Sequence, residues 1–91
     1  MAAELDAILS HGRLTSAEGC RRLVDQLHEQ PAAAQLSTLT RLEAALSISP
    51  HNRNLCAGPA GLLNALLPQL PRYADPECRA AALRIMRALG R

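Results

Sequence analysis

Three histidines and three cysteines are the side chains of this 91-residue chain that are best suited to bind a metal ion. A structural zinc site needs four such ligands, usually in close pairs such as C-x-x-C or H-x₃-H. The sequence contains neither pair, and the nearest His and Cys, His51 and Cys56, have no second pair near them. Cys56 and Cys78 fall on apolar faces of expected helices, where a free cysteine packs as a small hydrophobic residue. We therefore expect no bound metal and no cofactor.

Catalytic motifs are the next possibility for the chemistry of these residues. A nucleophilic Ser or Cys needs a neighbouring base, and the sequence contains no local signature such as G-x-S-x-G. The glycine-rich stretch "CAGPAG" lacks the G-K-[ST] that completes a phosphate-binding loop. We therefore expect that the chain is not an enzyme.

Arginines form the most promising charged surface. Arg84, Arg87 and Arg91 share one face of an expected C-terminal helix, while Ser37 and Arg41 point outward from an earlier helix. A solvated helix face is the ordinary explanation of such charges. Ten basic residues against eight acidic ones give a net charge of only +2, and a single aromatic residue provides no stacking platform. Nucleic acid is therefore not the expected ligand.

Glu43 is the one acidic residue that falls within an apolar stripe, beside Leu39 and Leu46. Its stem could pack at the edge of the stripe while its carboxylate reaches water. The alternative is that it pairs with an arginine or with free N–H groups of the next structural unit, because a buried carboxylate must be paired.

Helices are the elements expected to position these residues, because Leu and Ala are abundant while β-branched and aromatic residues are few. The pattern predicts a capping box of Thr15 with Glu18, an N-cap at Asp75, and a sharp turn in which Gly58 adopts positive φ. The expected N-cap of the short helix after Pro50 is Ser49 or one of the two residues that follow Pro50. Apolar spacing and breakers predict six helices, at about residues 2–10, 15–30, 31–49, 50–58, 62–70 and 75–90.

The six helices divide into two related sets of three. "RRLVDQL" at residues 21–27 matches "NALLPQL" at residues 64–70, and "LTRLEAAL" at 39–46 matches "ALRIMRAL" at 82–89. Both matches are displaced by 43 positions. A period of roughly 40 to 47 residues in an all-helical chain is typical of armadillo or HEAT repeats. Chance similarity between Leu- and Ala-rich helices is the alternative explanation.

The second set, "NRNLCAGPAGLLNALLPQLPRYADPECRAAALRIMRALG", resembles one armadillo unit: a short Asn-led helix, a glycine break, an "L-L-x-x-L-L" helix and a third helix that begins at "D-P-E". The first set is more degenerate. In armadillo solenoids the third helices line a concave groove, so the resemblance implies a strip that binds a protein partner. Its candidate residues are Ser37, Arg41, Arg84, Arg87 and Arg91. The stretch "LEAALSISPHNRNLCAGPAGLLNALL" is similar to the armadillo-like region of neurobeachin-like proteins, which are large scaffolds with a BEACH domain elsewhere. That resemblance implies a role in membrane and vesicle trafficking.

The sequence thus predicts a single all-α region over residues 1–91, an armadillo-like right-handed α-solenoid fragment with repeats at about 2–49 and 50–90. We expect a cytoplasmic, non-catalytic scaffold that binds a protein partner or the adjoining repeats of a larger chain. No segment is long enough to span a bilayer, so membrane association would come only through the larger protein. The alternatives are a closed six-helix death-domain-like signalling adaptor and a small nucleic-acid-binding helical module.

Uncovered apolar surface is a further expectation. The apolar arc of the last helix, which includes Leu83, Met86 and Leu89, is wider than a single neighbouring helix covers. A repeat that ends a solenoid normally has a polar outer side. We therefore expect this chain to bind a hydrophobic dye, to self-associate, or to become stable only beside an adjoining segment.

Overall fold

The computed structural model describes the backbone of residues 2–90 and the side chains of residues 5–90. Within this range the chain forms six α-helices, a 3₁₀ helix and one pair of very short strands. In chain order the elements are α1 (Ala2–Ile8), β1 (Leu9–Ser10), β2 (Arg13–Leu14), α2 (Ala17–Leu27), α3 (Ala32–Ile48), α4 (Pro50–Ala57), α5 (Leu62–Leu66), η1 (Leu67–Arg72) and α6 (Pro76–Leu89). The predicted all-α class is confirmed, whereas the strand pair was not predicted.

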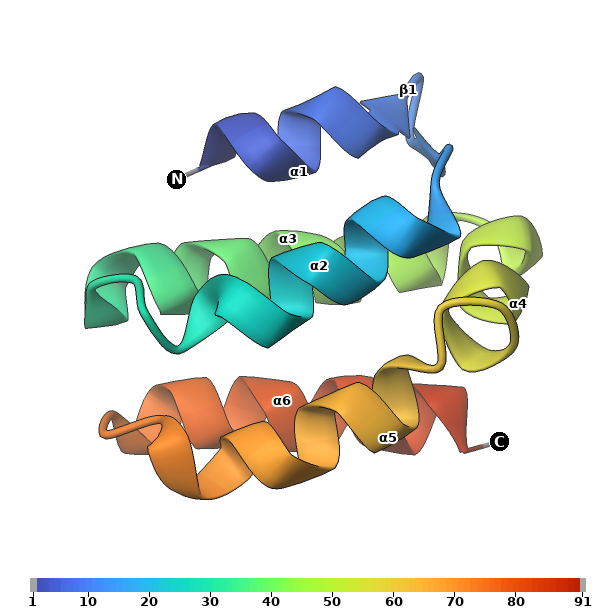
Figure 1. Cartoon of the computed structure of the whole chain (residues 1–91). Helices are drawn as coiled ribbons and strands as arrows, with labels where there is room; N and C mark the ends of the chain where they lie inside the picture. Colours follow the sequence, from blue (N-terminus) through green and yellow to red (C-terminus); the bar gives the residue numbers. More distant parts are fainter. Residues whose placement is uncertain (1, 91) are drawn as a thin grey trace.

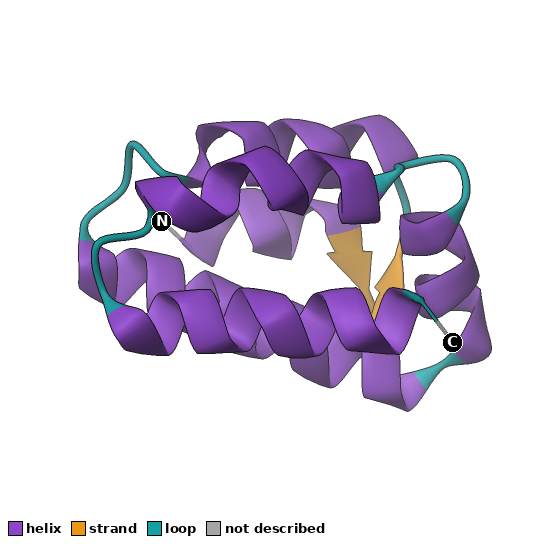
Figure 2. Ribbon diagram, turned by 90° about the horizontal axis from the view of Figure 1, so that it is seen from below, coloured by secondary structure: helices purple, strands orange, loops and turns teal. Residues whose placement is uncertain are grey.

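The helices are arranged in layers (Figure 1). The antiparallel pair of α2 and α3 forms the middle layer, and α5, η1 and α6 form the layer below it, with α2 packed against α5 and α3 against α6. The short helix α4 lies at one end, where it connects α3 to α5, and α1 lies above the middle layer. Figure 2 shows the same helices from below, with the strand pair behind them near one end. No other described element lies beneath the layer of α5 and α6.

The strand pair replaces the expected last turn of the first helix. Leu9 pairs with Leu14 and Ser10 with Arg13 in an antiparallel hairpin. The two residues at its tip, His11 and Gly12, have φ of 52° and 80°. Positive φ at both central positions is characteristic of the tight turns whose twist matches that of a hairpin. The prediction that the first helix continues to about Ser10 was therefore wrong, because the chain leaves the helix after Ile8.

Helix caps agree with the sequence at α4 and α6 but differ at α2. Asp75 accepts from the N–H of Glu77 at 2.9 Å, and Ser49 accepts from that of His51 at 3.1 Å. At α2 the N-cap is Ser16, which accepts from the N–H of Gly19 at 2.9 Å. The predicted capping box was wrong, because the Thr15 hydroxyl instead donates to the Ile8 carbonyl across the hairpin at 3.0 Å.

The "GPAG" turn between α4 and α5 is present, but a different glycine makes it possible. Gly58 has φ of −93°, so the prediction of positive φ there was wrong. Gly61 has φ of 59° and ψ of 41°, which is the left-handed region, and it is the N-cap of α5. Residues with a Cβ pay a steric cost in this region, while Asn tolerates it better than most.

We predict that Gly61→Val lowers the free energy of unfolding by about 1–2 kcal/mol, because valine must adopt the left-handed conformation. Gly61→Asn is the matched control and should cost less, since asparagine enters this region more readily. Urea denaturation followed by circular dichroism measures both values. Equal losses for the two variants would show that the backbone conformation of Gly61 does not limit stability.

The core is almost entirely aliphatic. The stripe predicted on α3 is confirmed, since Leu39, Leu42 and Leu46 are buried. The second helix of the second set, expected at residues 62–70, changes character at Leu67. There α5 gives way to η1 around Pro68 and Pro71, because proline cannot donate the interior helical hydrogen bond. Tyr73 is the only aromatic residue and is fully buried. Its hydroxyl has no hydrogen-bond partner among the described residues.

Burial raises the pKa of Tyr73 to about 12 from its ordinary value of 10.0. The folded chain therefore holds this proton more tightly than the unfolded chain. Its contribution to stability is fully present below pH 10 and is lost as the pH rises through 12. Because the chain has one tyrosine and no tryptophan, absorbance of the phenolate reports this group alone.

We predict that an alkaline titration of the native chain shows a tyrosine midpoint about two pH units above that of the chain in urea. Tyr73→Phe should lose less stability between pH 10 and pH 12 than the original chain, because it lacks this ionisation. A native midpoint near 10 would contradict the burial of the phenol.

Among the described residues, no helix has the length and apolar character that crossing a bilayer requires.

Candidate functional site

The predicted partner-binding strip divides between two helices that pack against each other. Ser37 and Arg41 lie on α3, and Arg84 and Arg87 lie on α6. Ser37 and Arg87 are exposed, and Arg91 lies outside the described residues. The strip is therefore assembled from the α3–α6 pair, which joins the two layers.

Two of its arginines are already engaged by carboxylates. The Arg41 guanidinium contacts the carboxylate of Asp6 on α1. Nε of Arg84 donates to both carboxylate oxygens of Glu43, at 3.1 and 3.0 Å. These ion pairs are solvent-exposed, so each stabilises the fold only weakly. Their main effect is to orient the arginines and to reduce the free positive charge of the surface.

Glu43 therefore pairs with an arginine, which is the second alternative that its position in the sequence suggested. Its side chain is 31% exposed, and it reaches from α3 of the middle layer to Arg84 of the lower layer. The sequence signal was the placement of a carboxylate within an apolar stripe. The pairing with an arginine of the next layer is confirmed.

A hollow of about 330 Å³ lies beside this ion pair. Its lining comes from α3, α4 and α6: Glu43, Leu46, Ser47, Arg53, Arg84 and Ala88. Arg53 and Arg84 bring two cationic groups to a partly apolar depression, and Arg87 follows one turn further along α6. Arginine at such a position suits a carboxylate, because its planar fork of donors matches two oxygens. Sequence reasoning missed Arg53, since α4 approaches α6 only in the folded chain.

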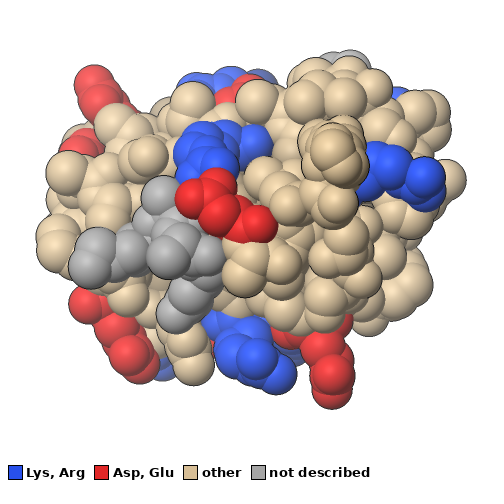
Figure 3. All heavy atoms as spheres, turned by 90° about the horizontal axis from the view of Figure 1, so that it is seen from above, with Lys and Arg blue, Asp and Glu red and all other residues tan. Residues whose placement is uncertain are grey.

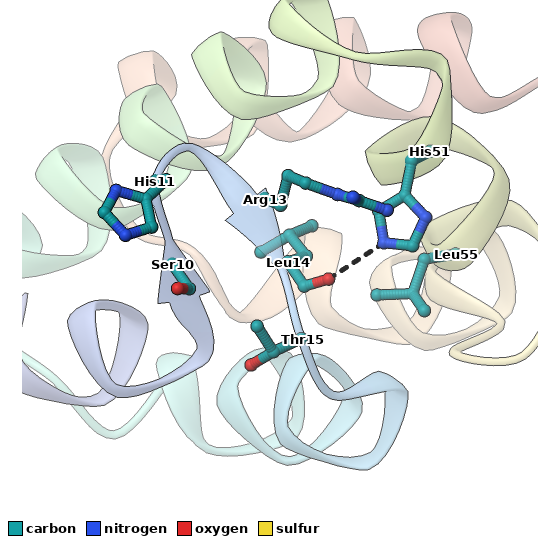
Figure 4. Close-up of a pocket in the computed structure, with 7 residues that line it drawn as sticks. All are labelled: Ser10, His11, Arg13, Leu14, Thr15, His51 and Leu55. Atoms are coloured by element: carbon teal, nitrogen blue, oxygen red, sulfur yellow. Dashed lines mark hydrogen bonds between the residues drawn. The ribbon is translucent and has the colours of Figure 1, made fainter.

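A second hollow, of about 480 Å³, lies between the hairpin and α4 (Figure 4). It is lined by Ser10, His11, Arg13, Leu14, Thr15, His51 and Leu55. Nε2 of His51 lies 3.1 Å from the Leu14 carbonyl oxygen. A carbonyl accepts only, so Nε2 carries the proton. Arg13 extends toward the imidazole of His51, whereas His11 and Ser10 lie on the opposite side of the hairpin.

In this second hollow, the Thr15 hydroxyl and the His51 imidazole are each bonded to a backbone carbonyl. The Thr15 hydroxyl donates to the Ile8 carbonyl, and His51 is held by the Leu14 carbonyl. Neither is hydrogen-bonded to the other, as a nucleophile and its base would be. The hollow was not predicted because its walls depend on the unpredicted hairpin.

Asn52 is the polar residue that holds the hairpin in place. It is completely buried on α4, and its side-chain oxygen accepts from the N–H of Leu14 at 2.8 Å. Its amide nitrogen donates to the carbonyls of Gly12 and Ala45, both at 2.8 Å. One side chain therefore connects the hairpin, α3 and α4. Sequence reasoning placed Asn52 only among the possible caps of α4.

All three cysteines are buried and free. Cys20 lies on α2 and Cys56 on α4. Cys78 on α6 donates to the Ala32 carbonyl at 3.6 Å. Within residues 5–90, no cluster of three His, Cys, Asp or Glu side chains is placed to hold a metal ion.

Charged groups of both signs occur on the face of the molecule that is seen from above (Figure 3). Figure 3 shows acidic and basic side chains interspersed on the face seen from above, with apolar and neutral atoms between them. A polyanion would favour a continuous basic stripe. This face does not present one.

Comparisons with protein-family models, with curated proteins and with solved structures found no significant match to this chain.

Proposed function

We propose that this chain is a non-catalytic protein-interaction scaffold made of two armadillo-like repeats, at about residues 2–49 and 50–90. Its occupant is another helical hairpin of the same kind, which docks on the outer side of α5, η1 and α6. The observation that carries this proposal is the exposure of large apolar side chains on these helices. Leu63 is 39% exposed, Leu67 59% and Leu83 42%.

The similarity between the two repeats shows which residues of the first repeat are equivalent to these exposed leucines. Displacement by 43 positions relates Leu63 to Cys20 and Leu67 to Val24. Cys20 and Val24 are completely buried, on the helix that packs against α5. Leu63 and Leu67 thus occupy positions that another helical layer covers in the first repeat. Their exposure supports a docking role, because neighbouring repeats bury each other's apolar faces.

The same displacement relates Glu43 to Met86. In the first repeat this position reaches across to Arg84 of the next layer. In the second repeat it is a half-buried methionine, a flexible side chain that adapts to an apolar partner. We therefore expect the docked helical hairpin to place an apolar side chain, rather than a cationic one, against Met86.

The arginines beside the smaller hollow supply a second contact. Arg53, which lines this hollow, and the exposed Arg87 complement an acidic segment of a bound protein, and such charges mainly set orientation and association rate. Binding of nucleic acid is disfavoured by the pairing of Arg41 and Arg84 with carboxylates.

The broader assignment to a BEACH-type protein in membrane and vesicle trafficking, with a cytoplasmic location, is part of the same proposal. It rests on the sequence resemblance alone. It is separable from the scaffold role, which is supported by the layer arrangement and the exposed leucines.

We predict that Arg84→Glu with Arg87→Glu reduces binding of a fluorescein-labelled, Glu-rich peptide at least tenfold. The matched control is Arg21→Glu with Arg22→Glu, which makes the same charge change on exposed residues of α2. Fluorescence anisotropy measures peptide binding, and a thermal melt checks that both variants fold. An equal loss in both variants would indicate that the charged face of α3 and α6 is an ordinary solvated surface.

A short DNA duplex should bind only weakly to the chain. A salt dependence of DNA binding equivalent to several phosphates would instead support the nucleic-acid alternative.

A further inference from the structure

Arg13 and His51 lie on the same side of the hollow between the hairpin and α4. Arg13 comes from β2 and His51 from the first turn of α4, and Figure 4 shows the Arg13 side chain extended toward the imidazole. Among residues 5–90, no side chain forms an ion pair or a hydrogen bond with the Arg13 guanidinium. The described lining of the hollow also includes no acidic residue. Its positive charge is therefore available to an anion.

The imidazole of His51 is held in one orientation and keeps one ring nitrogen free. Its Nε2 donates to the Leu14 carbonyl at 3.1 Å, which fixes the ring against the hairpin. Nδ1 has no hydrogen-bond partner among the described residues. This nitrogen accepts a hydrogen bond when the ring is neutral and donates one when the ring is charged. It can therefore bond to an oxygen that carries a proton or to one that does not.

A phosphate monoester is the anion that matches these two side chains. Its second ionisation falls near pH 6, within the range in which imidazoles change charge. One proton can therefore lie between a phosphate oxygen and Nδ1, whichever of the two atoms holds it. A carboxylate or a sulfate monoester has no such proton at neutral pH, so it bonds only to the charged ring. The planar guanidinium of Arg13 suits two further phosphate oxygens.

A third hollow adjoins this one and offers room for the organic part of such a molecule. It has a volume of about 230 Å³ and is lined by His51, Asn54, Leu55 and Pro59. His51 and Leu55 line both hollows, so the two are adjacent. Leu55 and Pro59 present apolar surface, while Arg13 lines only the larger hollow. A small ligand with one anionic end and one apolar end fits this arrangement.

We propose that the hairpin and α4 form a binding site for a small phosphate monoester with an apolar organic group. Arg13 and His51 bind the phosphate, and Leu55 and Pro59 contact the organic group. This site is separate from the docking surface on α5, η1 and α6, so either proposal can fail without the other.

Calorimetric titration of the chain with phenyl phosphate at neutral pH tests the site. We expect saturable binding of this probe. Inorganic phosphate, which lacks the ring, and phenyl sulfate and benzoate, which lack the shared proton, should each bind about tenfold more weakly or worse. The absence of saturable binding up to about 10 mM phenyl phosphate would overturn the proposal. Equal affinity for phenyl sulfate and phenyl phosphate would contradict recognition through the shared proton.

Three variants locate the bound phosphate. Arg13→Gln and His51→Gln should each weaken the binding of phenyl phosphate about tenfold or more, because each removes one of its charged or hydrogen-bonding partners. Arg22→Gln is the matched control, since Arg22 is an exposed residue of α2 that does not line the hollow. It should bind the probe as the original chain does. An equal loss in all three variants, or none in Arg13→Gln and His51→Gln, would overturn the proposal.

The imidazole signals of the original chain supply a readout that does not depend on the folding of a variant. The chain has three histidines, and the signals of His51 are identified by their absence from the NMR spectrum of His51→Gln. Addition of phenyl phosphate should shift the signals of His51 and leave those of His28, at the end of α2, in place. Equal shifts of the two sets of signals would contradict binding at the hairpin.

Discussion

Replacing Asn52 with leucine is expected to lower the free energy of unfolding by about 3 kcal/mol or more. The change removes three hydrogen bonds. Those to the N–H of Leu14 and the carbonyl of Ala45 are buried, and that to the carbonyl of Gly12 is partly buried. Each of these backbone groups then stays removed from water without a hydrogen-bond partner, which destabilises the fold. Urea denaturation measures the loss, and the hairpin should be the part that is most affected.

Asn54→Leu is the matched control for this prediction. It makes the same chemical change on the same helix, at a residue that is exposed. Its effect should stay within about 0.5 kcal/mol. Asn52→Asp adds a second comparison, because aspartate keeps the acceptor but loses the donor to Gly12 and Ala45. If Asn52→Leu and Asn54→Leu cost the same, Asn52 does not hold the hairpin to α4.

Replacing Leu63 and Leu67 together with glutamine is expected to remove most of the fluorescence enhancement that the chain produces with a hydrophobic dye. Both side chains are exposed and lie one helical turn apart, so they contribute to one patch. The fold should be retained, because polar replacement of exposed residues changes stability little. Dye titration gives the binding, and a thermal melt of the same sample gives the stability.

Ile48→Gln is the control for the dye experiment. Ile48 is 66% exposed, but it lies at the end of α3 rather than on the lower layer. Its replacement should leave most of the dye signal. A larger loss of dye fluorescence from Ile48→Gln than from the double variant would instead place the main apolar surface at the end of α3.

Local signals explain which parts of the fold could be predicted from the sequence. Asp75 followed by Pro76 defined the start of α6, and Pro50 that of α4, because caps and prolines act within one helical turn. Thr15 and Ser16 are adjacent hydroxyl residues, and only the hairpin decides between them. By engaging Thr15 with Ile8, it leaves Ser16 to cap α2.

Long-range contacts explain the rest. The hairpin depends on Asn52, whose partners Gly12 and Leu14 lie far away in the sequence. The burial of Cys20 and Cys56 likewise depends on the packing of separate helices, and no spacing rule indicates it. Glu43 was predictable in part, because a carboxylate within an apolar stripe requires a partner, although the sequence did not identify Arg84 as that partner.

Sedimentation velocity on the original chain and on the Leu63→Gln, Leu67→Gln variant tests the docking surface most directly. In a purified sample the only helical hairpin available to cover α5 and η1 belongs to a second copy of the chain. We therefore predict that the sedimentation coefficient of the original chain increases with concentration, while the variant remains a monomer over the same range. A monomeric original chain at every concentration, with a sharp unfolding transition and no dye binding, would contradict the proposed scaffold and favour a closed helical bundle.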